Sequence, residues 1–310
     1  MTEIRIGIVM YPGAQRSAAL GLADLFGIAG RMACNTEHDT PHLQVRLLES
    51  ETVSDAPLTD TCDVLILPPS LETPIKPKTA ATLAGWLRDK HAEGARLASI
   101  CGGAFLLGEA GLLKGRSVTT HWAYAELFRE RFPEAIVDAD RLLIDGGDII
   151  SAGGLMAWTD LGLKLVEQFL GPLVMAQTAR MLLIDPPGRE QRYYSGFAPK
   201  MNHGDGAILK AQHFMHAGSG KEARLAVLAK RAGLEQRTFL RRFQRATGMT
   251  ATDYAQRLRV TKAKEFLQFG RKPVERIAWE VGYSDPGAFR KVFHRVVGLT
   301  PGEYRRRFRA

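Results

Sequence analysis

Apolar residues in the first two thirds of the chain fall into short strand-like runs separated by longer helical stretches. The strand-like runs occupy residues 4–10, 43–49, 63–68, 96–100 and 148–154. Between them, residues 79–94 and 156–170 space their apolar side chains as an amphipathic helix does. Alternating strands and helices favour a doubly wound, mostly parallel sheet. We therefore predict an α/β domain over residues 1–184.

The apolar periodicity ends near Ile184, and a segment rich in Pro, Gly and polar residues follows. We predict that residues 185–204 form a flexible linker and that residues 205–310 form a second domain. A length of 310 residues agrees with two domains, because one domain typically takes ~150 residues.

The second domain contains an internal repeat. Leu228-Ala229 and Gly233 recur 49 residues later as Ile277-Ala278 and Gly282. Five further residues recur after 50 positions, namely Phe239, Phe243, Gly248, Thr250 and Tyr254, which match Phe289, Phe293, Gly298, Thr300 and Tyr304. Each copy predicts a short helix, a turn that contains glycine, and a second helix with an inward pair of phenylalanines. This is the pattern of a helix-turn-helix unit, so we predict an all-α domain with two such units.

The outward positions of each second helix carry side chains suited to DNA. If the phenylalanines face the core, the first copy exposes Gln236, Arg237, Leu240 and Arg241, and the second exposes Arg290, Lys291 and His294. Arg and Gln can pair bidentately with guanine and adenine in the major groove. We assign the other basic residues to phosphates, namely Arg242, Arg245, Arg295, Arg305, Arg306, Arg307 and Arg309.

The charge of the chain has the same division. The formal net charge is +9, but residues 205–310 hold 23 basic against 9 acidic residues, and residues 1–204 hold 19 against 24. The two parts thus carry +14 and −5. A basic domain with a repeated helix-turn-helix pattern indicates double-stranded DNA as the partner. A linking helix over residues 250–269 would space the two reading helices for successive major grooves, ~34 Å apart.

The residues 277–308, IAWEVGYSDPGAFRKVFHRVVGLTPGEYRRRF, resemble the C-terminal signature of the AraC/XylS transcription regulators. The resemblance covers about residues 205–310 and departs from the usual pattern mainly at Glu235 and Gly287. It implies a sequence-specific DNA-binding regulator, an activator that contacts RNA polymerase at a promoter operator. A helical bundle with an incidental basic face and an architectural DNA-binding protein are the alternatives.

In the first domain, an apolar strand ends at Ile100 and is followed by Cys101, Gly102 and Gly103 before a helix begins. This order is typical of a nucleophile elbow, in which the helix N-terminus lowers the thiol pKa and backbone N–H groups can hold an anion. His121 follows twenty residues later in the sequence TTHW.

The segment from Ser99 to Trp122 resembles the cysteine segment of the ThiJ/PfpI branch of the class I glutamine amidotransferase-like superfamily. That resemblance, which extends over about residues 4–184, implies a flavodoxin-like, amidotransferase-like fold. Together with the second domain, the chain resembles the GlxA-family transcription regulators, in which the first domain senses an effector or dimerises. This resemblance implies that a small-molecule effector binds at Cys101, Gly102, Gly103 and His121. It suggests nitrogen-containing metabolites, such as amino acids or quaternary amines, as the effector. It also implies a homodimer formed through the first domain.

One departure bears on catalysis. Enzymatic members place an acidic side chain near the thiol, where this chain has Ala18, and Asp24 is the nearest acid. Without that carboxylate the obvious acid/base for hydrolysis or hydration is missing. We therefore favour a degenerate site that binds and does not turn over, with Cys101 and His121 as vestigial catalytic candidates. The alternative is a cysteine-dependent enzyme, an amidase, hydratase or glyoxalase, with a DNA-binding appendage.

Other functional classes find little support. No nucleotide or metal motif is present, so we expect no cofactor and no metal. Cys34, Cys62 and Cys101 are too few and too widely spaced for a disulfide framework, which fits a reducing cytoplasm. No uninterrupted apolar run approaches the ~20 residues that cross a bilayer, so we expect no membrane partner.

Overall fold

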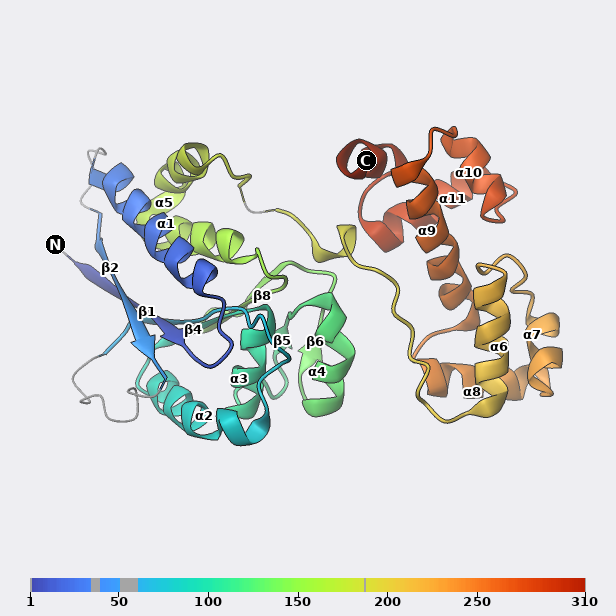
Figure 1. The fold of residues 1–310 in the computed structure, drawn as a ribbon, viewed down its shortest axis with the longest axis horizontal. Helices are drawn as coiled ribbons and strands as arrows, with labels where there is room; N and C mark the ends of the chain where they lie inside the picture. Colours follow the sequence, from blue (N-terminus) through green and yellow to red (C-terminus); the bar gives the residue numbers. More distant parts are fainter. Residues whose placement is uncertain (1, 35–39, 51–60, 187, 310) are drawn as a thin grey trace. The chain divides into compact units, whose positions relative to one another are not determined.

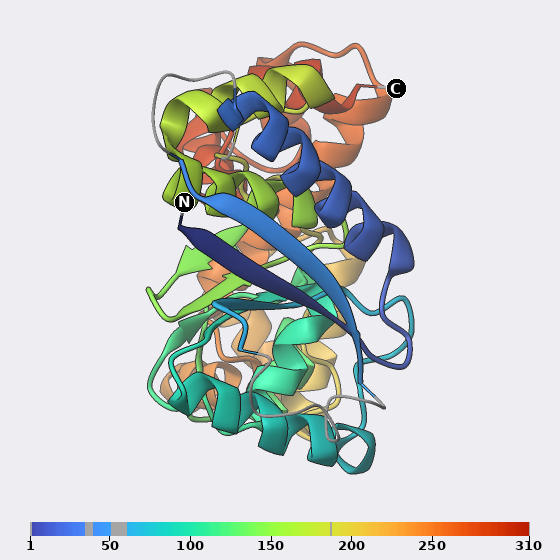
Figure 2. The same ribbon diagram turned by 90° about the vertical axis from the view of Figure 1, so that its left-hand side faces the viewer.

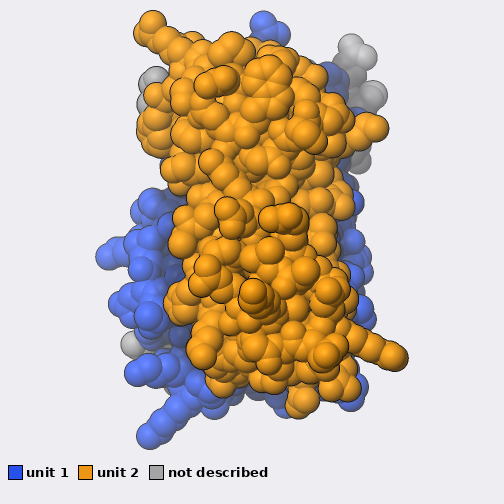
Figure 3. Space-filling view, turned by 90° about the vertical axis from the view of Figure 1, so that its right-hand side faces the viewer, with its two compact units in different colours: residues 1–191 blue, residues 192–310 orange. Residues whose placement is uncertain are grey.

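The computed structural model describes residues 2–34, 40–50, 61–186 and 188–309, which divide into two compact units (Figures 1 and 3). Unit 1 is Met1–Gln191 and unit 2 is Arg192–Ala310. The division falls inside the segment 185–204 that the sequence assigned to a linker, and Pro187 of that segment lies outside the described residues.

Unit 1 is built on a six-stranded sheet with the strand order β2-β1-β3-β4-β8-β7. The strands are β1 (Glu3–Met10), β2 (His42–Glu49), β3 (Val64–Leu67), β4 (Arg96–Ile100), β7 (Leu143–Asp145) and β8 (Ile149–Ala152). The first five in this order pair in parallel, and β7 adds to β8 antiparallel. This is the flavodoxin-like order, which confirms the predicted fold class.

Five of these strands are the five apolar runs of the sequence, whereas β7 was not predicted. Its three residues are too few for a period to be visible, and they are at most half-buried. A second small sheet joins β5 (Ser117–Val118) to β6 (Ile136–Val137).

Helices cover both faces of the main sheet (Figure 2). One face packs against α1 (Arg16–Cys34) and α5 (Trp158–Leu182), and the other against α2 (Pro77–Ala92), α3 (Ala104–Glu109) and α4 (Ala125–Arg131). In α5 the backbone breaks at Gly171, which has φ 85°, and resumes at Pro172. The predicted helix over 156–170 ends at this kink.

Among the described residues, α1 is the one helix with the length and apolar composition to cross a membrane. Its buried side chains, which include Leu22, Leu25 and Phe26, belong to the core between the sheet and α5. The apolar character of α1 is therefore accounted for by packing within unit 1.

Unit 2 consists of helices. They are α6 (Gly206–Ala217), α7 (Leu225–Ala232), α8 (Gln236–Thr247), α9 (Ala251–Phe269), α10 (Val274–Glu280), α11 (Pro286–Val297) and α12 (Pro301–Phe308). They surround two separate cores, one at Phe239, Phe243 and Tyr254 and the other at Phe289, Phe293 and Tyr304. These six residues are repeat partners, so the repeat in the sequence is a repeat of hydrophobic cores.

The repeated glycines and threonines set the helix ends. Gly248 and Gly298 end α8 and α11 in the left-handed region, with φ 73° and 82°, where a side chain is disfavoured. Two residues later Thr250 and Thr300 cap the next helix by accepting a hydrogen bond from a backbone N–H. Each copy therefore stops one helix and starts the next within three residues.

Candidate functional site

The outward face of α8 is polar and basic, as the sequence predicted. Phe239 and Phe243 are fully buried on one side of the helix. On the other side the exposed residues are Gln236, Arg237, Leu240, Arg241 and Gln244. Leu240 is 44% exposed and is the only large apolar side chain of this face. An apolar side chain between bidentate donors can contact the methyl group of thymine.

The outward face of α11 is similar, with Arg290, Lys291 and His294 exposed and Phe289 and Phe293 buried. The Arg290 guanidinium pairs with the carboxylate of Glu275, which lies on α10. Contact with DNA would therefore compete with that pair.

The two helices begin differently. Asp285 caps α11 by accepting hydrogen bonds from the N–H groups of Gly287 (2.8 Å) and Ala288 (2.9 Å), which lower the pKa of its carboxyl group. At the same place on α8 stands Glu235, whose side chain makes no capping bond. At Glu235, where the chain departs from the family pattern, α8 therefore begins without the side-chain cap that stabilises the start of α11.

Several basic residues that the sequence assigned to phosphates are engaged within unit 2. Arg242 donates two hydrogen bonds, of 2.9 and 2.7 Å, to the carboxylate of Asp205, the residue that caps α6. Arg305 donates to the carbonyl oxygen of Lys272, and Arg307 donates to the hydroxyl of Tyr194 at 3.0 Å. Arg242 therefore has a structural partner, and contact with a phosphate would compete with that ion pair. Among the described residues, no ion pair is found for Arg237, Arg241, Lys291 or Arg306.

In unit 1, Cys101 lies directly after β4 and opens the turn into α3, which is where the sequence placed it. Its φ of 54° is in the left-handed region, which is uncommon for a residue with a side chain and indicates backbone strain at this turn. A Cβ at Gly103 would lie 2.5 Å from the carbonyl oxygen of Leu67 and 2.7 Å from that of Pro68. Only glycine allows the turn to approach the end of β3 so closely.

The expectation that the helix N-terminus lowers the thiol pKa is wrong. Cys101 is 1% exposed, and burial raises the pKa of its thiol to about 11. Backbone N–H groups of Gly102, Gly154 and His121 face the sulfur and lower the pKa, but the loss of hydration outweighs them. The sulfur is therefore a buried neutral thiol in a ring of N–H donors.

The imidazole of His121 is engaged with the backbone of its own segment. Its Nδ1 accepts a hydrogen bond of 3.1 Å from the N–H of Ala123, and burial lowers the pKa of the ring. No hydrogen bond joins the ring to Cys101 among the described residues. Ala18 is buried in α1 and Asp24 is exposed, so neither supplies a carboxylate to the thiol.

Two tyrosines that sequence reasoning missed lie near the thiol. Burial is the main cause that raises the pKa of Tyr11 and of Tyr124, and the charged form of Cys101 raises both further. Tyr11 also lines a cavity of about 520 Å³ at the ends of β1 and β2, together with Arg16, Leu47 and Glu49 among others. A cavity of this size can hold a small molecule.

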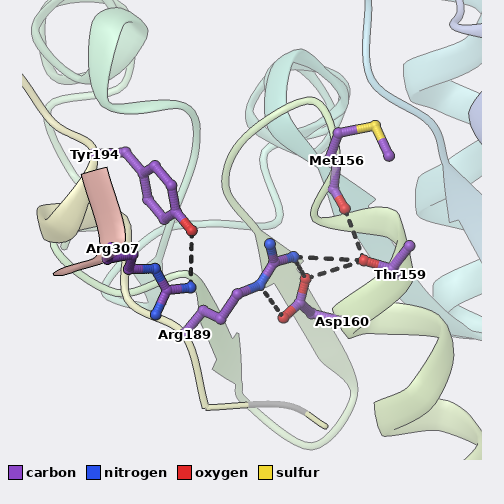
Figure 4. Close-up of polar contacts among 6 residues, drawn as sticks. All are labelled: Met156, Thr159, Asp160, Arg189, Tyr194 and Arg307. Carbon is purple, nitrogen blue, oxygen red and sulfur yellow. Dashed lines mark hydrogen bonds and ion pairs between the residues drawn. The ribbon is translucent and has the colours of Figure 1, made fainter. Parts of the chain in front are cut away.

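The expected linker is held by side chains on both sides of the unit boundary. In unit 1, Arg189 pairs with the buried carboxylate of Asp160 (Figure 4), and Gln191 is buried. In unit 2, Tyr194 accepts a hydrogen bond from Arg307 (Figure 4), and Lys264 donates one of 2.7 Å to the carbonyl oxygen of Ser195. No pattern in the sequence marks these contacts, because each joins residues that are distant along the chain.

Two family models match the chain. One is described as the DJ-1/PfpI family and matches residues 42–168, and the other is described as a helix-turn-helix domain and matches residues 228–307. The second match includes both repeat copies from α7 to α12 for nearly their whole length.

Three of the curated proteins to which the chain is similar illustrate its relationships. It is 30% identical over 217 residues to the HTH-type transcriptional regulator GlxA of Rhizobium meliloti, covering 69% of this chain and 66% of that one. It is 28% identical over 235 residues to the HTH-type transcriptional regulator CdhR of Pseudomonas aeruginosa, covering 75% and 69%. It is also 28% identical over 173 residues to an isonitrile hydratase of Pseudomonas putida, covering 54% and 73%. The chain thus spans about two thirds of the length of the two regulators.

The raised thiol pKa has a measurable consequence. With Cys34 and Cys62 replaced by serine, the rate of alkylation of Cys101 by iodoacetamide should keep rising as the pH increases from 7 to 10. An ordinary thiol, with a pKa of about 8.5, would level off within this range. A rate that levels off by pH 10 would contradict the burial that the structure gives this thiol.

Proposed function

The chain belongs to the transcription regulators that join a DJ-1/PfpI domain to an AraC-type helix-turn-helix domain, and we propose that it controls transcription by binding a specific operator under the control of a small-molecule effector. The observation that carries this proposal is the pair of reading helices in unit 2. Each presents an exposed polar and basic face, and both are fixed to one helix, α9.

The arrangement of unit 2 supports recognition of sequence and not attraction to phosphates alone. Arg237, Arg241 and Lys291, on the outward faces of α8 and α11, have no ion pair with any residue that the structure describes. Arg242, Arg305 and Arg307, in contrast, are tied to groups of the protein. Arg237, Arg241 and Lys291 can therefore reach base edges without breaking an ion pair, whereas Arg290 would first have to leave Glu275.

The cysteine site supports binding more than catalysis. A thiol with a pKa of about 11 is protonated at neutral pH, and among the described residues no carboxylate or imidazole is hydrogen-bonded to it. The N–H groups around the sulfur can instead hold the oxygen of a ligand. We therefore propose that the effector binds beside Cys101, Gly102, Gly103 and His121, and that it enters from the cavity lined by Tyr11.

A cysteine enzyme is the second candidate, because the chain is similar to an isonitrile hydratase over 173 residues. This length is close to that of unit 1, Met1–Gln191. This candidate requires that a ligand lower the thiol pKa on binding. Hydratase, amidase or glyoxalase activity that disappears in Cys101→Ala would favour it.

The proposal extends to the assembly of the protein. Exposed apolar side chains around α5, namely Leu155, Met156, Leu173, Met181 and Leu183, support a homodimer formed through unit 1. We propose that the dimer acts in the cytoplasm as an activator that contacts RNA polymerase. The similarity of the chain to the transcriptional regulators GlxA and CdhR supports a role in transcription.

Two neighbouring arginines of α8 separate base reading from structural support. Arg241→Ala should weaken binding to a selected operator by ~1–3 kcal/mol and relax the preference at one base, because its guanidinium is exposed and has no ion pair within the described part of the chain. Arg242→Ala should leave the base preference unchanged and lower the stability of unit 2, because Asp205 loses its partner. Fluorescence anisotropy with operator and mutated duplexes measures the first effect, and urea unfolding measures the second.

On the second reading helix, Lys291→Ala should behave as Arg241→Ala does. Arg306→Ala should weaken binding to all duplexes alike and make it less sensitive to salt. Equal loss of base preference in all four variants would contradict the division between reading and supporting residues.

Effector control predicts a ligand-dependent stability of the full chain. A panel of amino acids and quaternary amines should contain a compound that raises Tm by about 2 °C or more at saturation, because a ligand that binds only the folded state stabilises it. The same shift is expected for Arg241→Ala, whose changed residue lies in unit 2. If no compound in a broad panel shifts Tm, the support for an effector site is removed.

A further inference from the structure

The side chain of Gln191, the last residue of unit 1, is inserted into the fold of that unit. It is 3% exposed, although the surrounding sequence is that of a linker. Its Nε2 donates to Thr119 Oγ1 (3.1 Å), to the carbonyl oxygen of Thr120 (2.8 Å) and to that of Arg141 (3.0 Å), and its Oε1 accepts from the N–H of Trp122 (2.9 Å). Both ends of this buried amide are thus satisfied, as burial of a polar group requires.

The space for this amide is provided by Gly153. A Cβ at Gly153 would lie 2.0 Å from Nε2 of Gln191, closer than any contact allows. The φ of Gly153 is not in the left-handed region, so its backbone conformation does not call for glycine. The backbone carbonyl oxygen of Thr120, 2.8 Å from the same Cβ, also requires glycine here, and the absent side chain leaves the room that the Gln191 amide fills.

The walls of the socket are also the walls of the cysteine site. Thr120 Oγ1 donates a hydrogen bond of 2.7 Å to the carbonyl oxygen of Cys101. The N–H groups of His121 and Gly154 face the Cys101 sulfur. In the segments 119–122 and 153–154, residues that hydrogen-bond to Gln191 are therefore adjacent in sequence to residues that hydrogen-bond to Cys101.

We propose that Gln191 is a positioning residue that couples the occupancy of the cysteine site to the start of the DNA-binding unit. This proposal rests on the proposed effector site at Cys101. A ligand that displaces residues 119–122 or 153–154 breaks hydrogen bonds to the Gln191 amide, and the chain continues from Gln191 directly into Arg192, the first residue of unit 2. Release of Gln191 frees the point at which the DNA-binding unit is attached.

Coupling of this kind is reciprocal, so each end can be tested from the other. In the full chain with Cys34 and Cys62 replaced by serine, Gln191→Ala should raise the rate of Cys101 alkylation by iodoacetamide by about tenfold, because the socket that covers the thiol loses its hydrogen bonds. Gln191→Glu keeps the size of the side chain but cannot donate to the carbonyl oxygens, and it should act in the same direction. The matched control is Gln168→Ala, which removes a glutamine of α5 that makes two hydrogen bonds away from the socket.

The second arm leaves Gln191 in place. Alkylation of Cys101 should raise the rate of tryptic cleavage after Arg189 and Arg192 several-fold, with no change after Lys114, which lies in an exposed turn of unit 1. If Gln191 had only a local structural role, alkylation of Cys101 would leave the cleavage rates after Arg189 and Arg192 unchanged.

The outcomes separate the two proposals. An unchanged alkylation rate in both Gln191 variants, an equal rise in Gln168→Ala, or a rise in cleavage at all three sites would overturn the coupling. If both arms give the expected result while no metabolite shifts Tm, the coupling stands and the proposed effector is wrong.

Discussion

A single helix, α9, belongs to both hydrophobic cores of unit 2, and the function proposed for the protein depends on this sharing. Tyr254 and Ala255 at its start pack in the first core, and Ala263 and Leu267 near its end pack in the second. Since close-packed cores do not slide against their helices, α8 and α11 are fixed relative to α9. At a rise of 1.5 Å per residue, the 19 residues of α9 span about 28 Å, comparable to the ~34 Å between successive major grooves. The two reading helices can therefore bind DNA as one rigid unit.

The sequence predicted those elements whose signals are periodic or repeated. Five strands, the turn at Cys101 and both helix-turn-helix units follow from apolar spacing and from repeated glycine, phenylalanine and threonine. The three-residue strand β7 has no period to detect. The pairing of Arg242 with Asp205 joins residues 37 positions apart, and nothing in either local sequence marks it. The sequence predicted which side chains of the reading helices point outward. It did not predict that some of them, such as Arg242 and Arg290, pair with carboxylates of the same unit.

The cysteine site shows the same limit for chemistry. The strand, cysteine and paired glycines indicate a helix N-terminus beside a thiol, and that local argument predicts a lowered pKa. The loss of hydration depends on residues that are distant along the chain, since Tyr11, Tyr124, His121 and Gly154 lie around the thiol. A local motif therefore located the site, whereas the protonation state of the thiol came from the tertiary structure. The residues around this enclosed thiol also hold Gln191, the end of unit 1.

The most direct test of the central claim is selection of binding sites from a random duplex library, followed by footprinting of the full chain on the selected duplex. We expect an enriched sequence with two half-elements about one helical turn apart, and two protected major grooves on one face of the DNA. Protection of a single groove would contradict the fixed pair of reading helices. A library that shows no enrichment would contradict sequence-specific binding and indicate an architectural DNA-binding protein.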